Sequence, residues 1–117
     1  MPKILNLKQV WRDCIESCSD CHNVCVETAA YSLQQGGELS DAKHIAILYD
    51  CIDICQASIN SMSRGSELAN KICATCGNIC EICANHCDMF DDSKVKDCAR
   101  VCRECAAQCR EMAAVSV

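Results

Sequence analysis

The chain has 117 residues, a formal net charge of −5 and fifteen cysteines. This length suits a single domain, which we expect to span residues 1–117. An acidic chain with scattered lysines and arginines is not expected to bind nucleic acid. No segment approaches the roughly 18 apolar residues of a membrane span, so a membrane protein is excluded as well.

A cysteine count this high indicates either a disulfide framework or a metal site. The first residues, MPKILNLK, contain neither an apolar run suited to a signal peptide nor a twin arginine. We therefore expect a cytoplasmic protein, whose reducing surroundings favour metal binding over disulfides. The odd number of cysteines points the same way, because a complete disulfide scheme would leave one thiol unpaired.

The cysteines follow one repeated spacing, Cys-x-x-x-Cys-x-x-Cys-x-x-x-Cys. Steps of four and three residues keep side chains on one face of a helix, so each copy is a stripe of thiols. The stripe takes the place of the apolar seam of a coiled coil. Its three copies are Cys14, Cys18, Cys21, Cys25; Cys76, Cys80, Cys83, Cys87; and Cys98, Cys102, Cys105, Cys109.

The first expected helix covers residues 7–34, with Asn6 as its N-cap and Gly36-Gly37 as its stop. Its seam begins with the bulky residues Ile4, Leu7 and Trp11, which we interpret as an apolar plug at one end of the core.

Three further helices are expected, starting at the caps Ser40, Ser66 and Ser93. The second runs to about residue 63 and carries a degenerate stripe, in which His44 and Leu48 replace two thiols before Cys51 and Cys55. The third carries Cys73 ahead of its full stripe and ends near residue 88. The glycines and the only proline are expected outside the helix interiors.

Four helices joined by short turns predict an all-α fold, an antiparallel up-down-up-down four-helix bundle with a thiol-lined core. With a turn centred near Arg64, Cys51 should face the region of Cys76, and His44 should lie near Cys83. Each stripe spans eleven residues, so the thiols should form a column about 16 Å high at 1.5 Å of rise per residue.

Facing thiols suit soft ions, above all Cu(I). Seven pairs of cysteines lie one helical turn apart, and each pair could bind one ion in a two-coordinate arrangement. Cys73 remains and could bridge ions held by different pairs. If thiolates bridge two ions, the capacity is roughly 10–20 Cu(I) per chain. The predicted ligands are Cys14, Cys18, Cys21, Cys25, Cys51, Cys55, Cys73, Cys76, Cys80, Cys83, Cys87, Cys98, Cys102, Cys105, Cys109 and His44.

Several alternatives stay open at this point. A zinc or general soft-metal thiolate buffer would use isolated four-thiolate sites, about three or four per chain. An iron–sulfur carrier usually draws its cysteines from loops, and a disulfide-built protein would need cross-helix pairs. No arrangement of nucleophile and base suggests an enzyme. Copper is expected to enter at the end that holds His44, although Met62 and Met112 at the opposite end are also suited to guiding Cu(I).

On its stripes Cys14–Cys25, Cys51/Cys55, Cys73–Cys87 and Cys98–Cys109, the chain resembles the bacterial Cys-rich four-helix-bundle copper storage proteins over nearly its whole length. The resemblance implies many Cu(I) ions held inside the bundle, association into homotetramers, and membership of the cytosolic branch. The second helix departs from the pattern with only two cysteines, which implies a lower capacity than in the most thiol-rich relatives.

Overall fold

Four α-helices make up most of the part of the chain that the computed structural model describes, residues 2–114, with side chains described from residue 9 onward. The helices are α1 (Pro2–Gln35), α2 (Ala42–Ser63), α3 (Ala69–Cys87) and α4 (Ser93–Ala113), with a short 3₁₀ helix, η1 (Gly37–Ser40), between α1 and α2. The predicted all-α four-helix bundle is confirmed.

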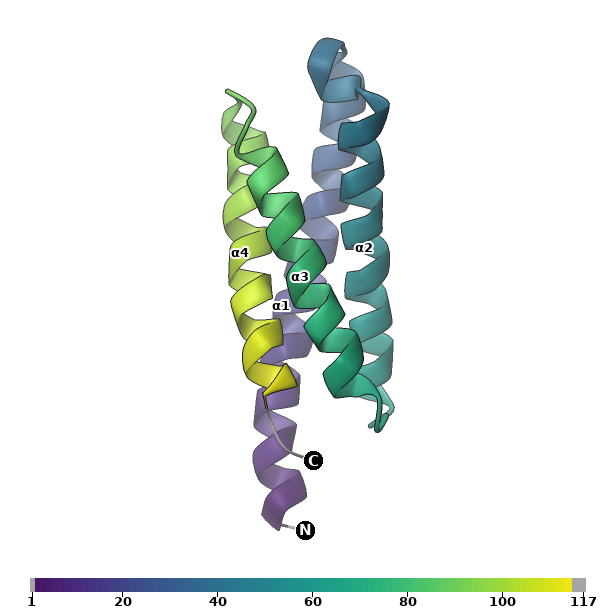
Figure 1. Cartoon of the computed structure of the whole chain (residues 1–117), viewed down its shortest axis with the longest axis vertical. Helices are drawn as coiled ribbons and strands as arrows, with labels where there is room; N and C mark the ends of the chain where they lie inside the picture. Colours follow the sequence, from purple (N-terminus) through teal and green to yellow (C-terminus); the bar gives the residue numbers. More distant parts are fainter. Residues whose placement is uncertain (1, 115–117) are drawn as a thin grey trace.

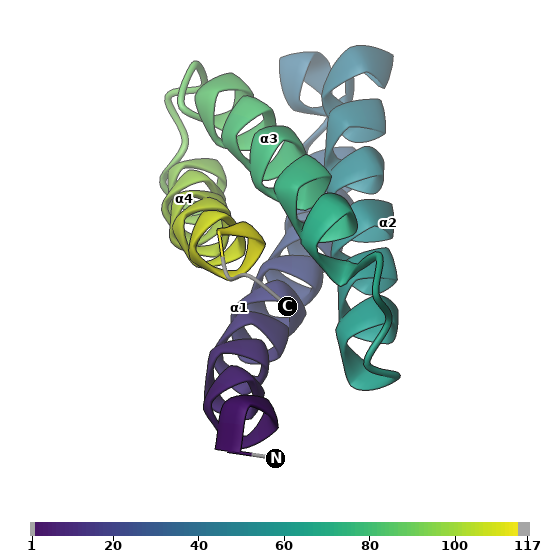
Figure 2. The same ribbon diagram turned by 60° about the horizontal axis from the view of Figure 1, so that its bottom comes forward.

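The helices form an antiparallel ring in which each packs against its neighbours in the chain, and α4 closes the ring on α1. α1 and α3 therefore lie diagonally across the core, and α3 runs between α2 and α4 (Figures 1 and 2). α1 has 34 residues and extends beyond the other three helices at the lower end of Figure 1. The side chains of Ile4 and Leu7, two members of the expected plug, lie outside the described residues.

The helix starts differ from the predicted caps. α1 begins at Pro2, a residue suited to the first helical position, so Asn6 lies inside the helix. Asp41 caps α2, and Asp92 caps α4 by accepting hydrogen bonds from two backbone N–H groups. The predicted serine caps at 40 and 93 are therefore wrong, because a neighbouring aspartate competes for the same position.

The connection between α2 and α3 also corrects the predicted register. Ser66 caps only the turn before α3, which begins at Ala69. The connection spans residues 64–68 and is centred two residues later than predicted, so facing residues shift by about one helical turn. As a result, Cys51 faces Cys80 rather than the region of Cys76, with 3.7 Å between the sulfurs.

Gly77 lies inside α3, against the expectation that glycines avoid helix interiors. A Cβ atom at this position would lie 3.4 Å from both the Ala106 carbonyl oxygen and the Cys109 Cβ. Glycine thus lets α3 and α4 pack closely where both carry thiols, at some cost in helix propensity.

Candidate metal centre

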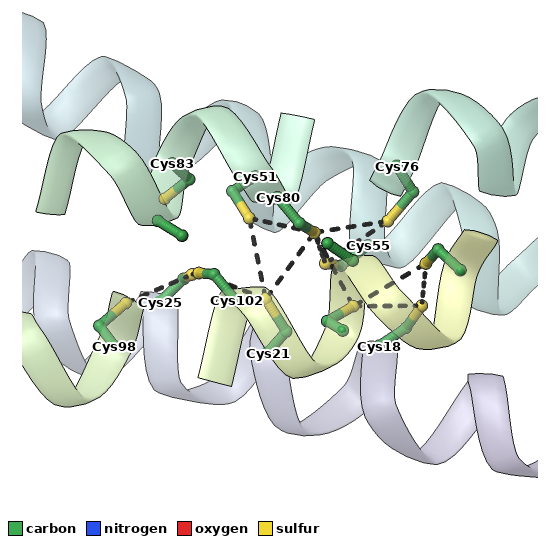
Figure 3. Packing of buried hydrophobic residues seen from close by; sticks show 14 of the residues in the cluster. Cys18, Cys21, Cys25, Cys51, Cys55, Cys76, Cys80, Cys83, Cys98 and Cys102 are labelled. Carbon is green, nitrogen blue, oxygen red and sulfur yellow. Dashed lines mark hydrogen bonds between the residues drawn. The ribbon is translucent and has the colours of Figure 1, made fainter. Parts of the chain in front are cut away.

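All fifteen cysteines are free thiols and all are fully buried. They project inward from the four helices and form one continuous column (Figure 3). The column is the core of the bundle, since the other fully buried residues are mainly alanines, small hydroxylic residues and a few larger side chains at the two ends. The predicted thiol-lined core is therefore observed.

The sulfurs contact one another between helices as well as along them. Cys18 and Cys109, on α1 and α4, have the shortest separation, with 3.6 Å between their sulfurs. Cys21 reaches Cys51 on α2 at 3.8 Å and Cys80 on α3 at 4.0 Å. Sulfurs one turn apart on the same helix are no closer, as the 3.8 Å between Cys76 and Cys80 shows. Sites between helices are thus as well formed as the intrahelical pairs inferred from sequence.

Ten of the cysteines fall into three groups of four, in which all sulfurs lie within 4.8 Å of one another. Two groups have no member in common, and the third shares Cys21 with one of them and Cys105 with the other. The groups are Cys18, Cys76, Cys105, Cys109; Cys21, Cys55, Cys80, Cys105; and Cys21, Cys25, Cys51, Cys102.

The sulfur spacing by itself suits two kinds of ion. At a typical separation of 3.8 Å, the centre of a regular tetrahedron of sulfurs lies about 2.3 Å from each, which matches the Zn–S bond length. The centre of a triangle with the same edge lies about 2.2 Å from each sulfur, which suits the lower coordination numbers of Cu(I).

The sharing of sulfurs distinguishes the two ions. Structural zinc sites are closed sets of four ligands, and only two of the three groups can be filled without a common sulfur. The Cys80 sulfur illustrates the alternative, because it lies within 4.0 Å of five other sulfurs. A column of this kind favours an ion whose thiolates bridge from one centre to the next, as those of Cu(I) do.

Eight of the buried thiols have a raised pKa and keep their protons in the unloaded column, whereas six others have a lowered pKa. Hydrogen bonds to neighbouring thiols, chiefly Cys21, together with burial raise the pKa of Cys102. Hydrogen bonds to Cys83 and Cys98, together with burial, raise the pKa of Cys87. Only the thiolate is a metal ligand, so loading must release protons from these groups.

Five cysteines lie outside the three groups, and four of them extend the column toward its two ends. Cys98 continues it upward from Cys25, with 3.8 Å between the sulfurs, and interacts with Cys87 of α3, whereas Cys83 lies beside Cys25 and Cys102. At the lower end, Cys14 lies 3.9 Å from Cys109 and also interacts with Cys73.

His44 lies at the upper end, 1% exposed, and belongs to none of the cysteine groups. Its Nε2 is 3.1 Å from the Ser32 hydroxyl, and its Nδ1 is 3.1 Å from Nε2 of His86. Because both ring nitrogens already have partners, His44 must give up one of these hydrogen bonds before it can bind an ion. Its predicted neighbour Cys83 is replaced by His86, as the register shift requires.

Sequence reasoning did not assign a role to Phe90. This residue lies in the connection between α3 and α4, and its ring centroid is 4.5 Å from that of His44 and 5.4 Å from that of His86. Burial is the main cause that lowers the pKa of both histidines, so the pair is neutral at pH 7. No spacing rule joins positions 44, 86 and 90, and only the packed helix ends bring them together.

A four-helix bundle with a continuous core of free, mutually contacting thiols defines a class of proteins that hold several soft metal ions. Comparison with family models narrows the class, because the model of the copper storage proteins matches residues 7–114. The chain belongs to the copper storage protein family, as the resemblance in its cysteine stripes predicted.

Solved structures agree with this assignment. A protein from Nitrosospira multiformis is 36% identical over 93% of this chain and 99% of its own, with a TM-score of 0.87. The Cu(I)-bound form of copper storage protein 3, a protein of Bacillus subtilis, is 34% identical over 90% and 99%, with a TM-score of 0.85.

A cytosolic copper storage protein from Streptomyces lividans, solved with five coppers, shares the fold at 24% identity, with a TM-score of 0.83 over 95% and 98% of the two chains. No curated protein sequence matches the chain. Among the described residues, no helix combines the length and apolar character that crossing a membrane requires.

Proposed function

We propose that this chain stores many Cu(I) ions through the thiolates of its fifteen cysteines, with a capacity of roughly 10–20 ions if most thiolates bridge. The observation that carries the proposal is the sharing of sulfurs, which turns three candidate sites into one continuous column. Ions coordinated entirely by the protein's own thiolates would have no open position for a substrate. We therefore propose no catalytic role for the chain.

Anaerobic titration of the reduced chain with Cu(I), in competition with a strong Cu(I) chelator, tests this proposal. We expect uptake to continue well beyond four equivalents, with no break at one ion per four cysteines. Saturation at about three or four equivalents would contradict storage, because it is the result expected for isolated four-thiolate sites.

A zinc or general thiolate buffer is the second candidate, and the 3.8 Å sulfur spacing supports it. A parallel titration with Zn(II) should saturate after only a few ions, since a closed tetrahedral site shares sulfurs poorly. Zinc uptake equal to copper uptake would favour this candidate instead.

We also propose that copper enters at the end that holds His44 and His86, where Phe90 covers the pair. The Phe90→Ala variant should load and release Cu(I) several-fold faster in stopped-flow transfer from a chelator, with unchanged capacity. Tyr49→Ala, which removes an exposed aromatic side chain of α2, is the matched control. Equal rates in wild type and both variants would place the route elsewhere.

A second copy of the chain is the partner that we propose for the α2–α3 face. Ile47 and Ile54, seven residues apart on α2, form a mainly apolar groove there with Ile79 and Ile82 of α3, and Asp50 and Asp53 also line it. Ile47, Ile54 and Ile79 are partly buried against the core of their own chain, so Ile82 is the strongly exposed member of this groove. A homotetramer, as the family resemblance implies, would cover the 59% exposed Ile82.

Analytical ultracentrifugation of the Ile82→Asp variant checks this surface. A buried, unpaired carboxylate opposes association, so the variant should sediment as a smaller species than wild type. Val26→Asp, on an exposed position of α1, is the control and should leave the assembly unchanged. Identical sedimentation of all three proteins would rule out the groove as the interface.

We propose that the chain resides in the cytoplasm, because the reducing environment there keeps cysteine thiols reduced and able to bind metal. Fractionation of cells that express the chain should place it with cytoplasmic markers, and recovery in a membrane or extracytoplasmic fraction would contradict this.

A further inference from the structure

The lower end of the thiol column carries two buried methionines. Met62 of α2 is 2% exposed and Met112 of α4 is fully buried, whereas Met89, near the opposite end, is 74% exposed. Met62 lies seven residues after Cys55 and Met112 three residues after Cys109, so both continue the thiol seams of their helices. They occupy the positions where a further layer of thiols would lie.

On the α1–α2 side, the helix ends place Cys14 level with Met62. A Cβ atom built on Gly65 would lie 3.8 Å from the Trp11 ring, which brings this part of α1 beside the end of α2. Cys14 comes three residues after Trp11, and Met62 comes three residues before Gly65. Because the two helices are antiparallel, these equal offsets bring both sulfur-bearing residues to the same height.

The α3–α4 side places Cys73 and Met112 at that height too. The side-chain amide of Asn70 donates a hydrogen bond of 3.4 Å to the Ala113 carbonyl, so the start of α3 lies beside the end of α4. Cys73 follows Asn70 by three residues, and Met112 directly precedes Ala113. Each of the four helices therefore contributes one sulfur-bearing residue to the last layer, and all four belong to the same buried cluster.

The charge balance at this layer suits thioethers. Inside the column each thiolate can share its single negative charge between two bridged ions, so equal numbers of thiolates and Cu(I) ions balance, but below this layer no further thiol follows. Among the described residues, none of the buried ones is a lysine, arginine, aspartate or glutamate. One Cu(I) with one thiolate and two neutral thioethers carries no net charge, and a second thiolate is balanced when it also bridges to a Cu(I) ion in the column, as Cys14 can do through its neighbour Cys109.

Within the part of the chain that the structure describes, buried hydroxyls without a hydrogen-bond partner lie on α2 toward this end, and Thr28 is another such group toward the opposite end. The hydroxyls of Ser58 and Ser61 are buried and have no hydrogen-bond partner among the described residues. Buried hydroxyls are nearly always paired. A sulfur that carries negative charge after metal binding would accept a hydrogen bond from such a group far better than a neutral thiol does.

We propose that Met62, Met112, Cys14 and Cys73 form a mixed thiolate–thioether site that closes the column and holds one Cu(I) ion. The inference rests on the proposed storage function and extends it to a site whose thioethers bind without losing a proton. It assigns a role to two residues that bundle packing alone would otherwise explain.

The test uses the full chain, with its methionines labelled with ¹³C at the methyl group, and Cu(I) delivered from a chelator complex. The methyl resonances of Met62 and Met112 should shift as the column fills, while the exposed Met89 serves as the internal control. The Met62→Leu, Met112→Leu double variant preserves side-chain volume and should keep its fold, which a thermal melt of the apo form verifies. Its Cu(I) capacity should fall by about one ion, a loss that Met89→Leu should not reproduce.

A double variant that folds and keeps the full capacity overturns the site, even if the wild-type resonances shift, because a nearby ion could move them without ligation. Unshifted resonances in a full column overturn it as well. Failure of the storage function is distinguishable, since wild type would then saturate at only a few ions.

Discussion

Replacing Cys80 by serine is expected to lower the Cu(I) capacity by about two ions, more than the same change at an end of the column, because bridging sulfurs hold more than one ion. Cys80 lies at the centre of the network, and its sulfur is within 4.0 Å of those of Cys21, Cys51, Cys55, Cys76 and Cys105. Serine offers a hard oxygen of similar size, so the neighbouring thiolates keep their positions but lose their common bridge.

Cys73→Ser is the matched control, because it makes the same chemical change at an equally buried site in the last layer. It should cost about one ion or less, since fewer centres can share this sulfur. Both variants should remain folded, with a loss of about 1–3 kcal/mol from burying a hydroxyl, measured by urea unfolding of the apo forms. Complete loss of copper binding in Cys80→Ser would reveal a discrete site, and equal losses in the two variants would reveal independent pairs.

The seam of each helix could be predicted from sequence because side-chain direction follows directly from helical periodicity. Every cysteine of the three stripes lies on the buried face, as do Cys51, Cys55 and Cys73. The register between helices could be predicted less accurately from sequence, because it depends on the residue at which each turn is centred. A shift of two residues in the connection between α2 and α3 was enough to exchange the partner of Cys51.

Sequence could not separate sites along a helix from sites between helices. Spacing rules favour the pair Cys76 and Cys80, but the structure places Cys55 just as close to Cys80, at 3.8 Å. Which of these pairs an ion occupies depends on the distance between helix axes, and residues such as Gly77 set that distance. The partners of His44 likewise depend on helix ends that meet only in the folded bundle.

Copper affinity is expected to fall as the pH falls, by roughly tenfold per pH unit for each proton that an ion displaces. The sign follows from the thiols whose pKa is raised. Hydrogen bonds to other thiols, Cys105 foremost, and burial raise the pKa of Cys55, so it carries a proton at neutral pH. Cu(I) must remove that proton, and acidification makes the removal less favourable.

Two thiols should add to this dependence only in acid. Hydrogen bonds, chiefly from Cys102, lower the pKa of Cys83 to about 7. Those from Cys105 and other neighbours lower the pKa of Cys109 to about 6. Above these values both groups are already thiolates and release no proton on binding. Below them each must lose one, so the slope of affinity against pH should steepen as the pH falls through 7 and then through 6.

Chelator competition at a series of pH values, corrected for protonation of the chelator, measures this slope, and a pH indicator dye counts the protons released. The Cys109→Ser variant isolates one contribution, because it should lose the steepening near pH 6 and keep the one near pH 7. An affinity that did not change with pH would mean that the unloaded column already consists of thiolates. Since so many buried negative charges would repel one another strongly, that result would require cations in the column before copper arrives, and the chain would then exchange ions rather than fill an empty store.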